Sequence, residues 1–399
     1  MSEIYLDNSA TTRPCPASIE AMTDAMLNVF GNPSSMHKVG SDAAQLLLSS
    51  RNEILCAIHG STIRPKLPRK PMMKGGEEFG KLIFTSGGTE ANNLAIFGTV
   101  SSCKKSKPEI ITTDSEHPSV LNAVEKLAES GCTVHKLKTV NGVIDLDELR
   151  SLVNANTILV TVMHVNNETG AVYDVASVFK TVKSINPDAV CHTDCVQSFQ
   201  KIRLTPKLLC ADMISISAHK VHGPKGVGAL WVSKELIQKK RPNPLLIGGG
   251  QEEAFRSGTE NLPGIAAFAA AVKANGSDKA YASFFDAVMP LRGLIENELP
   301  FGAKINLPKG EFAPHIISIS LPIPKSQPML NYLSALGIYV SSGSACSSKK
   351  NTVSHVLSAF GLPNSTADAT IRVSLDASNT DEEIREFISA LKSGIEKLK

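Results

Sequence analysis

The segment DMISISAHKVHGPKGVGALWV, residues 212–232, places two apolar runs of strand type on either side of a polar, glycine-rich turn. The first run ends at Ser217, and Lys220 follows in the turn. An ammonium group at the end of a buried strand is unfavourable unless it is paired with an acid or loses its charge. Two explanations are therefore open for Lys220: a structural ion pair, or an amine consumed as a Schiff base, whose pKa the site lowers.

Similar short apolar runs recur along the chain, separated by amphipathic segments. Strands are expected at residues 81–86, 109–113, 157–163, 189–194, 212–217 and 228–232. Residues 119–130 and 175–186 carry apolar side chains at helical spacing. This alternation predicts an α/β fold with a large, mostly parallel sheet that helices cover on both faces. The ligand site of such a sheet lies at the carboxyl ends of its strands.

The pattern changes after about residue 262. Two strand-like runs at 315–321 and 369–375 and a terminal amphipathic helix from Asp381 predict a smaller α+β domain. We therefore expect a large cofactor-binding domain at 17–261 and a small domain made of 1–16 and 262–399. Residues 60–80 are basic and contain three prolines, which predicts a loop or linker.

Composition excludes several classes of protein. The chain has 399 residues, 42% of them hydrophobic and 20% charged, as in ordinary globular proteins. Its 41 basic and 38 acidic residues give a net charge of +3 without long blocks of one sign, so no nucleic-acid partner is expected. No signal peptide and no apolar run of membrane-spanning length are present, which predicts a cytoplasmic protein with no membrane partner. The eight cysteines are scattered, as reduced thiols are.

Two other predicted strand ends carry polar groups. The stretch TSGGTEANN, residues 85–93, follows a strand and opens a helix, which suits either a phosphate site or an ordinary tight turn. Asp194 ends the strand 189–194 and precedes Gln197, although a helix cap would also explain this carboxylate. Asp194, Lys220 and a phosphate-binding turn together indicate pyridoxal phosphate, with Lys220 forming a Schiff base and Asp194 keeping the ring nitrogen protonated.

Ten short motifs occur in order along nearly the whole chain. They are YLDNSATT (5–12), GNPSSMH (31–37), FTSGGTEANN (84–93), EHPSVL (116–121), MHVNNETG (163–170), HTDCVQ (192–197), SAHKVHGPKG (217–226), RSGTEN (256–261), SGSACSS (342–348) and IRVSL (371–375). Together they resemble the cysteine desulfurases of the NifS/IscS type, which are class V aminotransferase-like enzymes. The resemblance implies PLP-dependent transferase fold type I and pyridoxal 5'-phosphate as the cofactor.

The resemblance also implies a role for each matching residue. Lys220 is expected to bind the cofactor and to move the substrate α-proton, and His117 to stack on the cofactor ring. Outside this context, His117 would be read as an ordinary core histidine and Arg372 as an exposed arginine. The residues expected to bind the cofactor are Gly88, Thr89, His117, Asn167, Asp194, Gln197, Ser217, His219 and Lys220, with Thr259 supplied by the other subunit of a homodimer. Asn167 and Arg372 are expected to position the substrate, Arg372 by gripping its α-carboxylate.

Cys346 is the expected third catalytic residue, with Lys220 and His117. Small polar residues surround it and two lysines follow, which favours a partly exposed thiol of lowered pKa. The resemblance makes Cys346 the residue that takes sulfur from L-cysteine as a persulfide, leaving L-alanine. An iron–sulfur scaffold or a tRNA-thiolation relay is the implied acceptor protein. The other seven cysteines are expected to be small buried hydrophobes, and no metal site is expected at Cys191, His192 and Cys195.

Two other hypotheses remain open. A selenocysteine lyase, or another class V transaminase or β-lyase, would share the cofactor residues without needing Cys346. A non-catalytic sulfur carrier or scaffold protein would keep only the fold, and the presence of Lys220 argues against it.

Overall fold

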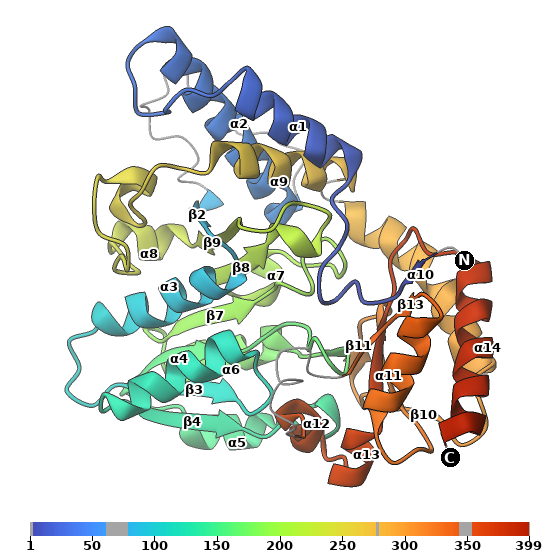
Figure 1. The fold of residues 1–399 in the computed structure, drawn as a ribbon. Coiled ribbons are helices and arrows are strands. Elements are labelled where there is room, and N and C mark those ends of the chain that lie inside the picture. Colours follow the sequence, from blue (N-terminus) through green and yellow to red (C-terminus); the bar gives the residue numbers. More distant parts are fainter. Residues whose placement is uncertain (1–2, 61–78, 277–278, 343–352, 399) are drawn as a thin grey trace.

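The computed structural model describes residues 3–60, 79–276, 279–342 and 353–398 (Figure 1). Cys346 and most of the predicted loop at 60–80 lie outside these residues. Figure 1 shows a larger unit of strands and helices beside a smaller one, and the two ends of the drawn chain both lie on the smaller unit. No helix among the described residues is long and apolar enough to cross a membrane.

The larger unit is built on a seven-stranded sheet, which contains the six predicted strands and one more. Its strands, in spatial order, are β2 (Lys81–Thr85), β9 (Gly228–Val232), β8 (Met213–Ser217), β7 (Val190–Asp194), β5 (Thr157–Thr161), β3 (Glu109–Thr113) and β4 (Thr133–Leu137). Within this sheet β9 runs antiparallel to both neighbours, and the other neighbouring pairs are parallel. The α/β fold class is therefore confirmed.

Helices cover both faces of this sheet, which explains why its inner strands are continuous apolar runs. Residues of α3 (Gly88–Ser101) and α4 (Pro118–Glu129) pack in the core on one face. Residues of α2 (Lys38–His59), α6 (Val175–Ile185) and α9 (Leu262–Ala274) pack in the core on the other. The remaining helices of this unit are α1 (Pro16–Leu27), α5 (Leu146–Leu152), α7 (Pro206–Leu209) and α8 (Lys234–Gln238), with 3-10 turns at Val140–Gly142, Ala218–Lys220 and Gln251–Ala254.

The smaller unit has its own antiparallel sheet and its own core. The strands in order are β10 (Lys304–Ile305), β12 (Ile316–Ser320), β15 (Thr370–Ser374) and β14 (Ser341–Ser342). Helices α10 (Ala280–Asn297), α11 (Ser326–Ala335) and α14 (Asp381–Leu398) supply apolar residues to this core. Short helices α12 (His355–Phe360) and α13 (Asn364–Asp368) precede β15, and β6 (Ala171–Val172) pairs with β11 (Glu311–Phe312).

The N-terminal segment belongs to the smaller unit before it enters the larger one. Strand β1 (Ile4–Tyr5) runs parallel to β13 (Ile338–Tyr339), and Ile4 and Leu6 lie in the smaller core. Helix α9, by contrast, packs against α1 and α2, and its apolar residues join the larger core. The expected domain division stays a prediction, and the packing of α9 favours a boundary after this helix rather than before it.

Candidate active site

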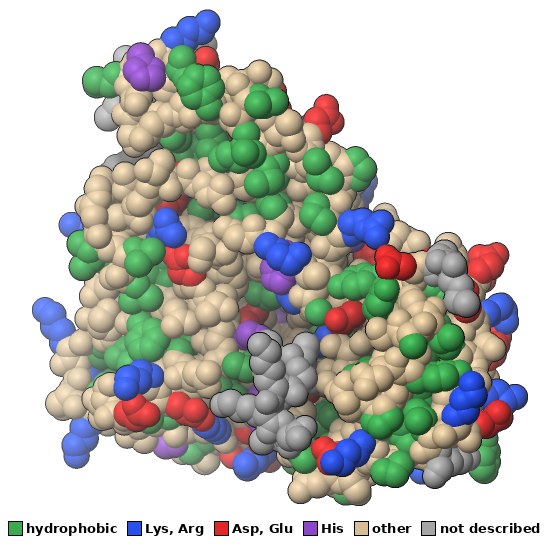
Figure 2. Space-filling view, viewed as in Figure 1, with side chains coloured by type: hydrophobic (Ala, Val, Ile, Leu, Met, Phe, Trp, Pro, Cys, Tyr) green, Lys and Arg blue, Asp and Glu red, His purple; other side chains and the backbone are tan. Residues whose placement is uncertain are grey.

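The predicted site residues come from strand ends of the larger sheet and from β15 of the smaller one. Figure 2 shows histidine, acidic and basic side chains gathered in the hollow between the two units. Lys220 ends the 3-10 turn Ala218–Lys220 directly after β8, while Asp194 is the last residue of the neighbouring strand β7. The carboxyl ends of parallel strands meet at one edge of a sheet, so the fold itself brings these two residues together.

The amine of Lys220 is held by the backbone of the N-terminal segment. Its Nζ donates hydrogen bonds to the carbonyl oxygens of Ser9, at 2.5 Å, and Ala10, at 2.7 Å. Burial lowers the pKa of the Lys220 amine to about 7, and the nearby cations Arg372 and Lys201 act in the same direction. About half of an amine with such a pKa is unprotonated at neutral pH and available as a nucleophile and a base. The structural ion pair is therefore the poorer of the two explanations for this lysine.

His117 is held in one tautomer by a short chain of hydrogen bonds. The backbone N–H of Ser119 donates to His117 Nδ1 at 3.1 Å, so this nitrogen is an acceptor and the proton of the neutral ring is on Nε2. Asn92 Nδ2 donates both to Asp194 Oδ2, at 2.7 Å, and to Ser119 Oγ, at 2.9 Å. The Ser119 hydroxyl then donates to His117 Nδ1 at 2.8 Å. The acid and the histidine are thus oriented by the same asparagine.

Burial keeps His117 neutral. It lowers the pKa of the imidazole, the charge of Asp194 acts in the opposite direction, and the positive charge of Lys220 adds to the effect of burial. His117 also caps the N-terminus of α4, where a positive charge would be unfavourable. The ring therefore carries a single proton, on Nε2, which is the arrangement needed to donate that proton and take it back.

The turn before α3 has the features of a phosphate site. A Cβ on Gly88 would lie 2.7 Å from Val196 Cγ2 and 3.7 Å from Ser217 Cβ, so Gly88 lies close to the end of β8. The Ser217 hydroxyl is buried without a hydrogen-bond partner among the described residues. A Cβ on Gly228 would lie 2.7 Å from the backbone of Gly87, so the turn approaches β9 closely. An unsatisfied buried hydroxyl beside the N-terminus of a 14-residue helix fits a bound phosphate.

Two other predicted cofactor residues contact the N-terminal segment, and a third follows the phosphate turn. His219 Nδ1 lies 3.2 Å from Thr11 Oγ1, and burial, together with Lys220, lowers the pKa of its imidazole to about 4. Gln197 Nε2 donates to the Ser9 carbonyl at 2.9 Å, while its buried Oε1 has no partner in the described part of the chain. Thr89 follows Gly88 in the first turn of α3. The residues present therefore fit pyridoxal phosphate.

Arg372 lies inside the protein, contrary to the reading of an exposed arginine. The residue is 2% exposed and lies on β15. Its Nη1 donates to the Asn167 carbonyl at 2.9 Å, and its Nη2 donates to Asp7 Oδ1 at 2.7 Å. Its buried Nε has no partner among the described residues. A buried guanidinium with a spare donor suits a carboxylate ligand.

Thr259 lies beside the start of the phosphate turn of its own chain. It lines a cavity of about 130 Å³ together with Ser86, Gly226 and Arg256. Within the described residues no hydrogen bond joins Thr259 to the phosphate turn of the same chain. Its expected contribution to a second subunit stays a prediction.

Described residues on either side of positions 343–352, which include Cys346, contact predicted site residues or their neighbours. Ser341, on strand β14, is paired with Arg372. On the other side, the Ser354 hydroxyl donates to Glu168 Oε2 at 2.5 Å, and His355 Nε2 donates to the carbonyl of Glu116 at 3.1 Å. Both anchoring points are therefore adjacent to predicted site residues.

The cluster of Cys191 and His192 on β7 and Cys195 just after it has a structural explanation. His192 Nδ1 lies 2.8 Å from Thr161 Oγ1, and its Nε2 lies 2.9 Å from Ser215 Oγ, so neighbouring strands use both ring nitrogens. Burial raises the pKa of Cys195 to about 12 and raises that of Cys191 as well. Among the described residues no group of three or more potential ligands is placed to hold a metal ion.

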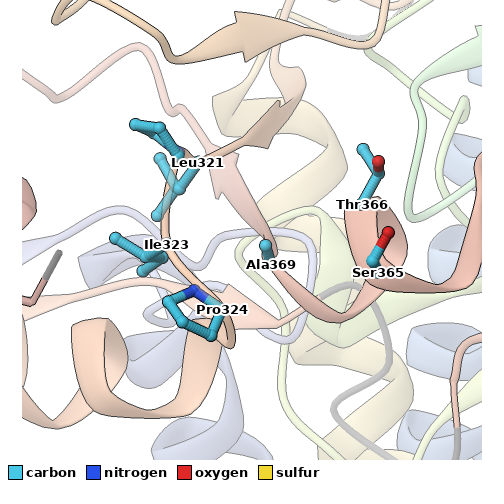
Figure 3. Close-up of a pocket in the computed structure, with 7 residues that line it drawn as sticks. Leu321, Ile323, Pro324, Ser365, Thr366 and Ala369 are labelled. Atoms are coloured by element: carbon cyan, nitrogen blue, oxygen red, sulfur yellow. The ribbon is translucent and has the colours of Figure 1, made fainter.

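Another cavity lies on the smaller unit and carries no chemistry of this kind. Its volume is about 470 Å³, and its lining includes Leu321, Pro324, Ser365 and Ala369 (Figure 3). No residue that lines it is ionisable. The chemistry is therefore concentrated between the two units.

Sequence reasoning did not single out three residues that shape this site. Asn92 and Asp7 lie inside motifs that the sequence analysis quotes, but nothing in the local pattern shows that they contact Asp194 and Arg372. Glu116 precedes His117, and its fully buried carboxyl accepts hydrogen bonds from Thr113 Oγ1, at 2.8 Å, and the Met163 N–H, at 2.9 Å. Burial raises its pKa to about 8. The sequence feature that could have identified these three residues is their position within the quoted motifs.

A buried lysine, a strand-end aspartate and a phosphate turn on this fold define a pyridoxal phosphate site. The family described as "Aminotransferase class-V" matches residues 73–387. A cysteine desulfurase of Trichormus azollae is 37% identical over 403 residues, covering 100% of this chain and 94% of the relative. The cysteine desulfurase IscS of Buchnera aphidicola subsp. Schizaphis graminum is 36% identical over 410 residues, covering 99% and 93%.

Structural comparison agrees. A solved structure of a NifS-like protein has a TM-score of 0.87 and 33% sequence identity, covering 100% of both chains. The chain belongs to the class-V aminotransferase family, among the cysteine desulfurases of the NifS/IscS type. This family depends on pyridoxal 5'-phosphate, so the expected cofactor is confirmed.

Proposed function

We propose that this chain is a cysteine desulfurase that converts L-cysteine to L-alanine and transfers the sulfur, through Cys346, to an acceptor. One observation carries the proposal: the Lys220 amine, the single-proton His117 and the Arg372 guanidinium converge in a chain that cysteine desulfurases match end to end. Arg372 is suited to bind the substrate, and Lys220 and His117 are suited to transfer protons. The individual residue roles below are part of the proposal.

Substrate binding falls to Arg372. Its spare Nε–H, together with a neighbouring Nη, forms the planar fork that binds a carboxylate through both oxygens. Asp7 and the Asn167 carbonyl hold the guanidinium in place, so little conformational entropy is lost when the substrate binds. Burial excludes water and strengthens the interaction.

Proton transfer falls to Lys220 and His117. Pyridoxal phosphate, when bound, withdraws electrons from the substrate and so acidifies its α C–H bond. The Lys220 amine, with a pKa near 7, is suited to take this proton and release it again. His117 Nε2 holds the second mobile proton. The phosphate is expected on Gly88, Thr89, Ser217 and His219, with Asp194 and Gln197 at the ring.

Sulfur transfer requires a thiol, which we assign to Cys346. The Cys346 thiolate attacks the substrate sulfur, so an S–S bond forms as the bond between substrate carbon and sulfur breaks. The electron pair of that bond stays on carbon, which takes up the proton given up by the Cys346 thiol and becomes the methyl group of L-alanine, while the transferred sulfur is oxidised to the sulfane level. The step is redox-neutral overall and needs no external oxidant. Its products are L-alanine and a Cys346 persulfide.

The assembly and setting of the enzyme also belong to the proposal. A homodimer in which each subunit supplies Thr259 to the other rests on the resemblance of the RSGTEN motif to the NifS/IscS type. The IscS relative supports an iron–sulfur scaffold or thiolation relay as the sulfur acceptor. A cytoplasmic location accords with the scattered thiols.

The test is incubation with L-cysteine and a thiol reductant, with alanine and sulfide measured together. Equal amounts of the two support desulfuration. Pyruvate with ammonia would instead identify a β-lyase. Selenide from selenocysteine without sulfide from cysteine would identify a selenocysteine lyase, and absence of any product from the loaded protein would leave only a carrier role.

A further inference from the structure

His222 and Asp376 form a link between the two units of the protein. His222 follows Lys220 by two residues, and Asp376 follows Arg372 by four. His222 Nε2 lies 2.9 Å from Asp376 Oδ2, and His222 Nδ1 lies 3.0 Å from the carbonyl oxygen of Arg13. The pair thus connects the turn that carries the proposed cofactor lysine to the strand that carries the proposed substrate arginine.

Both residues of this link make further hydrogen bonds within the protein. The His222 N–H donates to Thr12 Oγ1 at 2.8 Å, and its carbonyl accepts from the N–H of Cys15 at 2.9 Å. Asp376 Oδ1 accepts from the hydroxyl of Ser378 at 2.7 Å, which leaves Oδ2 for His222. His222 also has a φ of 64°, in the left-handed region that non-glycine residues rarely adopt. Such a conformation persists where surrounding contacts fix it.

The hydrogen-bond partners determine how many protons His222 carries. A carbonyl oxygen can only accept, so Nδ1 must carry a proton to bond Arg13. A carboxylate also only accepts, so Nε2 must carry a second proton to bond Asp376. The complete link therefore requires the imidazolium form, and loss of one proton breaks one of the two bonds.

We propose that His222 and Asp376 are positioning residues that hold the Lys220 turn against the strand of Arg372, and that the link is complete only while the imidazole carries both protons. Neither residue is among those assigned to the substrate or the cofactor. It acts by fixing the distance between the amine and the guanidinium, which lie on different units. Loss of the link frees the turn without removing any group of the site.

The charges around the pair determine the direction of the pH dependence. Burial lowers the pKa of His222, but the hydrogen bond and charge of Asp376 outweigh burial and raise it above its ordinary value. Asp376 in turn is held ionised well below its usual pKa range by His222 and Ser378, against burial. Lys201, in the segment after β7, opposes protonation of His222, and the buried His315, before β12, faces Lys201 and Asp376.

The raised pKa of His222 makes the protein's stability depend on pH. Because the folded pKa of His222 is raised, its contribution to stability is fully present below about pH 6.5 and is lost as the pH rises through the folded pKa. Burial lowers the pKa of Lys201 to about 8, so the charge that opposes protonation of His222 declines at alkaline pH and partly offsets the opening. The Asp376 charge persists throughout this range. The hydrogen-bonded link between His222 and Asp376 is therefore formed at neutral and mildly acidic pH and opens as the pH rises.

Asp376→Asn is the decisive variant because it reverses this dependence. An asparagine Nδ2 in place of Oδ2 donates to an unprotonated His222 Nε2, while Nδ1–H still bonds the Arg13 carbonyl. The variant link is complete with the neutral imidazole and breaks when the ring gains its second proton. His222→Gln, which does not titrate, provides a pH-independent donor to Asp376.

The experiment measures amide hydrogen exchange of residues 218–223 in the cofactor-free protein between pH 6 and pH 9, expressed as protection factors. We expect protection to fall several-fold with rising pH in the wild type, to rise in Asp376→Asn, and to stay flat in His222→Gln. His135→Gln, which breaks the histidine–carboxylate pair with Glu109 at 3.0 Å between β3 and β4, is the matched control and should follow the wild type. A wild-type profile in Asp376→Asn, or a sloping one in His222→Gln, would overturn the proposal.

A second readout reports the position of Lys220 itself. Opening of the turn exposes the amine, so the midpoint of its acylation in the cofactor-free His222→Gln variant should stay near pH 7 and that of His222→Ala should rise by roughly one unit. Equal midpoints in the two variants would contradict a positioning role. The relevance to catalysis depends on the proposed function of Lys220, whereas hydrogen exchange does not. Failure of borohydride trapping at Lys220 would therefore remove the proposed function and leave the link to be judged separately.

Discussion

Arg372 Nη2 donates to Asp7 Oδ1 across 2.7 Å, although the two residues are 365 positions apart in the chain. The contact ties the last strand of the smaller sheet to the segment that supplies the carbonyl acceptors of Lys220. Asp7 therefore influences two proposed functions at once. It orients the guanidinium, and its charge favours protonation of the nearby amine.

Asp7→Asn should lower the pKa of Lys220 further. The asparagine keeps an oxygen for the Arg372 hydrogen bond but removes the negative charge that raises this pKa. We expect the midpoint of Lys220 acylation in the cofactor-free protein to fall by roughly half a unit below that of the wild type. Glu298→Gln, in the exposed pair with Arg385, is the control and should leave the midpoint unchanged. A rise in Asp7→Asn would contradict the electrostatic role.

Ser119→Ala should slow proton transfer while leaving the acid Asp194 in place. The change removes the hydroxyl that donates to His117 Nδ1 and keeps the backbone N–H that donates to the same atom. We expect kcat to fall about tenfold, because the tautomer is held by one bond instead of two. Nitrogen NMR of His117 should still find Nδ1 unprotonated. Ser184→Ala, on the exposed surface of α6, should have wild-type kcat, and equal kcat in the two variants would be a refutation.

Glu116→Gln should flatten the dependence of stability on pH. Burial raises the pKa of the Glu116 carboxyl to about 8, so its contribution is present at low pH and is lost as the pH rises from about 4.3 towards 8. The variant has no charge to bury, and its melting temperature at pH 8.5 should exceed that of the wild type by a few degrees.

The melting temperatures of Glu116→Gln and the wild type are compared from pH 5 to pH 8.5. Glu125→Gln removes an exposed carboxylate that pairs with Lys136 and should reproduce the wild-type slope. Parallel slopes in Glu116→Gln and the wild type would show that the buried carboxyl does not titrate in this range.

Cys346→Ser should abolish sulfide production from L-cysteine and preserve substrate binding. Serine cannot form a persulfide, whereas Lys220, Asp194 and Arg372 are untouched. We expect background sulfide together with an unchanged spectral response to L-cysteine. Cys103→Ser, a partly buried thiol near the end of α3, should retain full activity. Sulfide release by Cys346→Ser at the wild-type rate would assign the acceptor role to another group.

Much of the larger sheet was predictable because its strands are buried on both faces. Thr157–Thr161 and Met213–Ser217 are fully buried, so continuous apolar runs mark them. Strand β4 (Thr133–Leu137) lies at the edge of the sheet, and its side chains range from exposed to buried. It therefore has no continuous apolar run from which it could be predicted. Helix α9 is apolar over most of its surface, which indicates burial but not the sheet against which it packs.

Some residues of the candidate site were also predictable from the sequence, whereas the contacts between distant segments were not. Asp194 and Lys220 were predictable because each follows a strand, and the topology of a parallel sheet brings strand ends together. The contacts of Asp7 with Arg372 and of Ser9 with Lys220 join residues 365 and 211 positions apart. Local periodicity carries no information about such pairs, which depend on how the two units close on each other. The roles of the individual residues stay predictions.

The parallel pairing of β1 with β13 has a consequence for synthesis of the protein. Ile4 is aligned with Ile338, about 330 residues later in the chain. At ribosomal rates of about 5–20 residues per second, the first strand waits on the order of half a minute for its neighbour. The segment that supplies the carbonyl acceptors of Lys220 is also bonded to Ser374, whose Oγ accepts from the Ser9 N–H at 2.9 Å, so a nascent chain has no assembled site until Ser374 has been made.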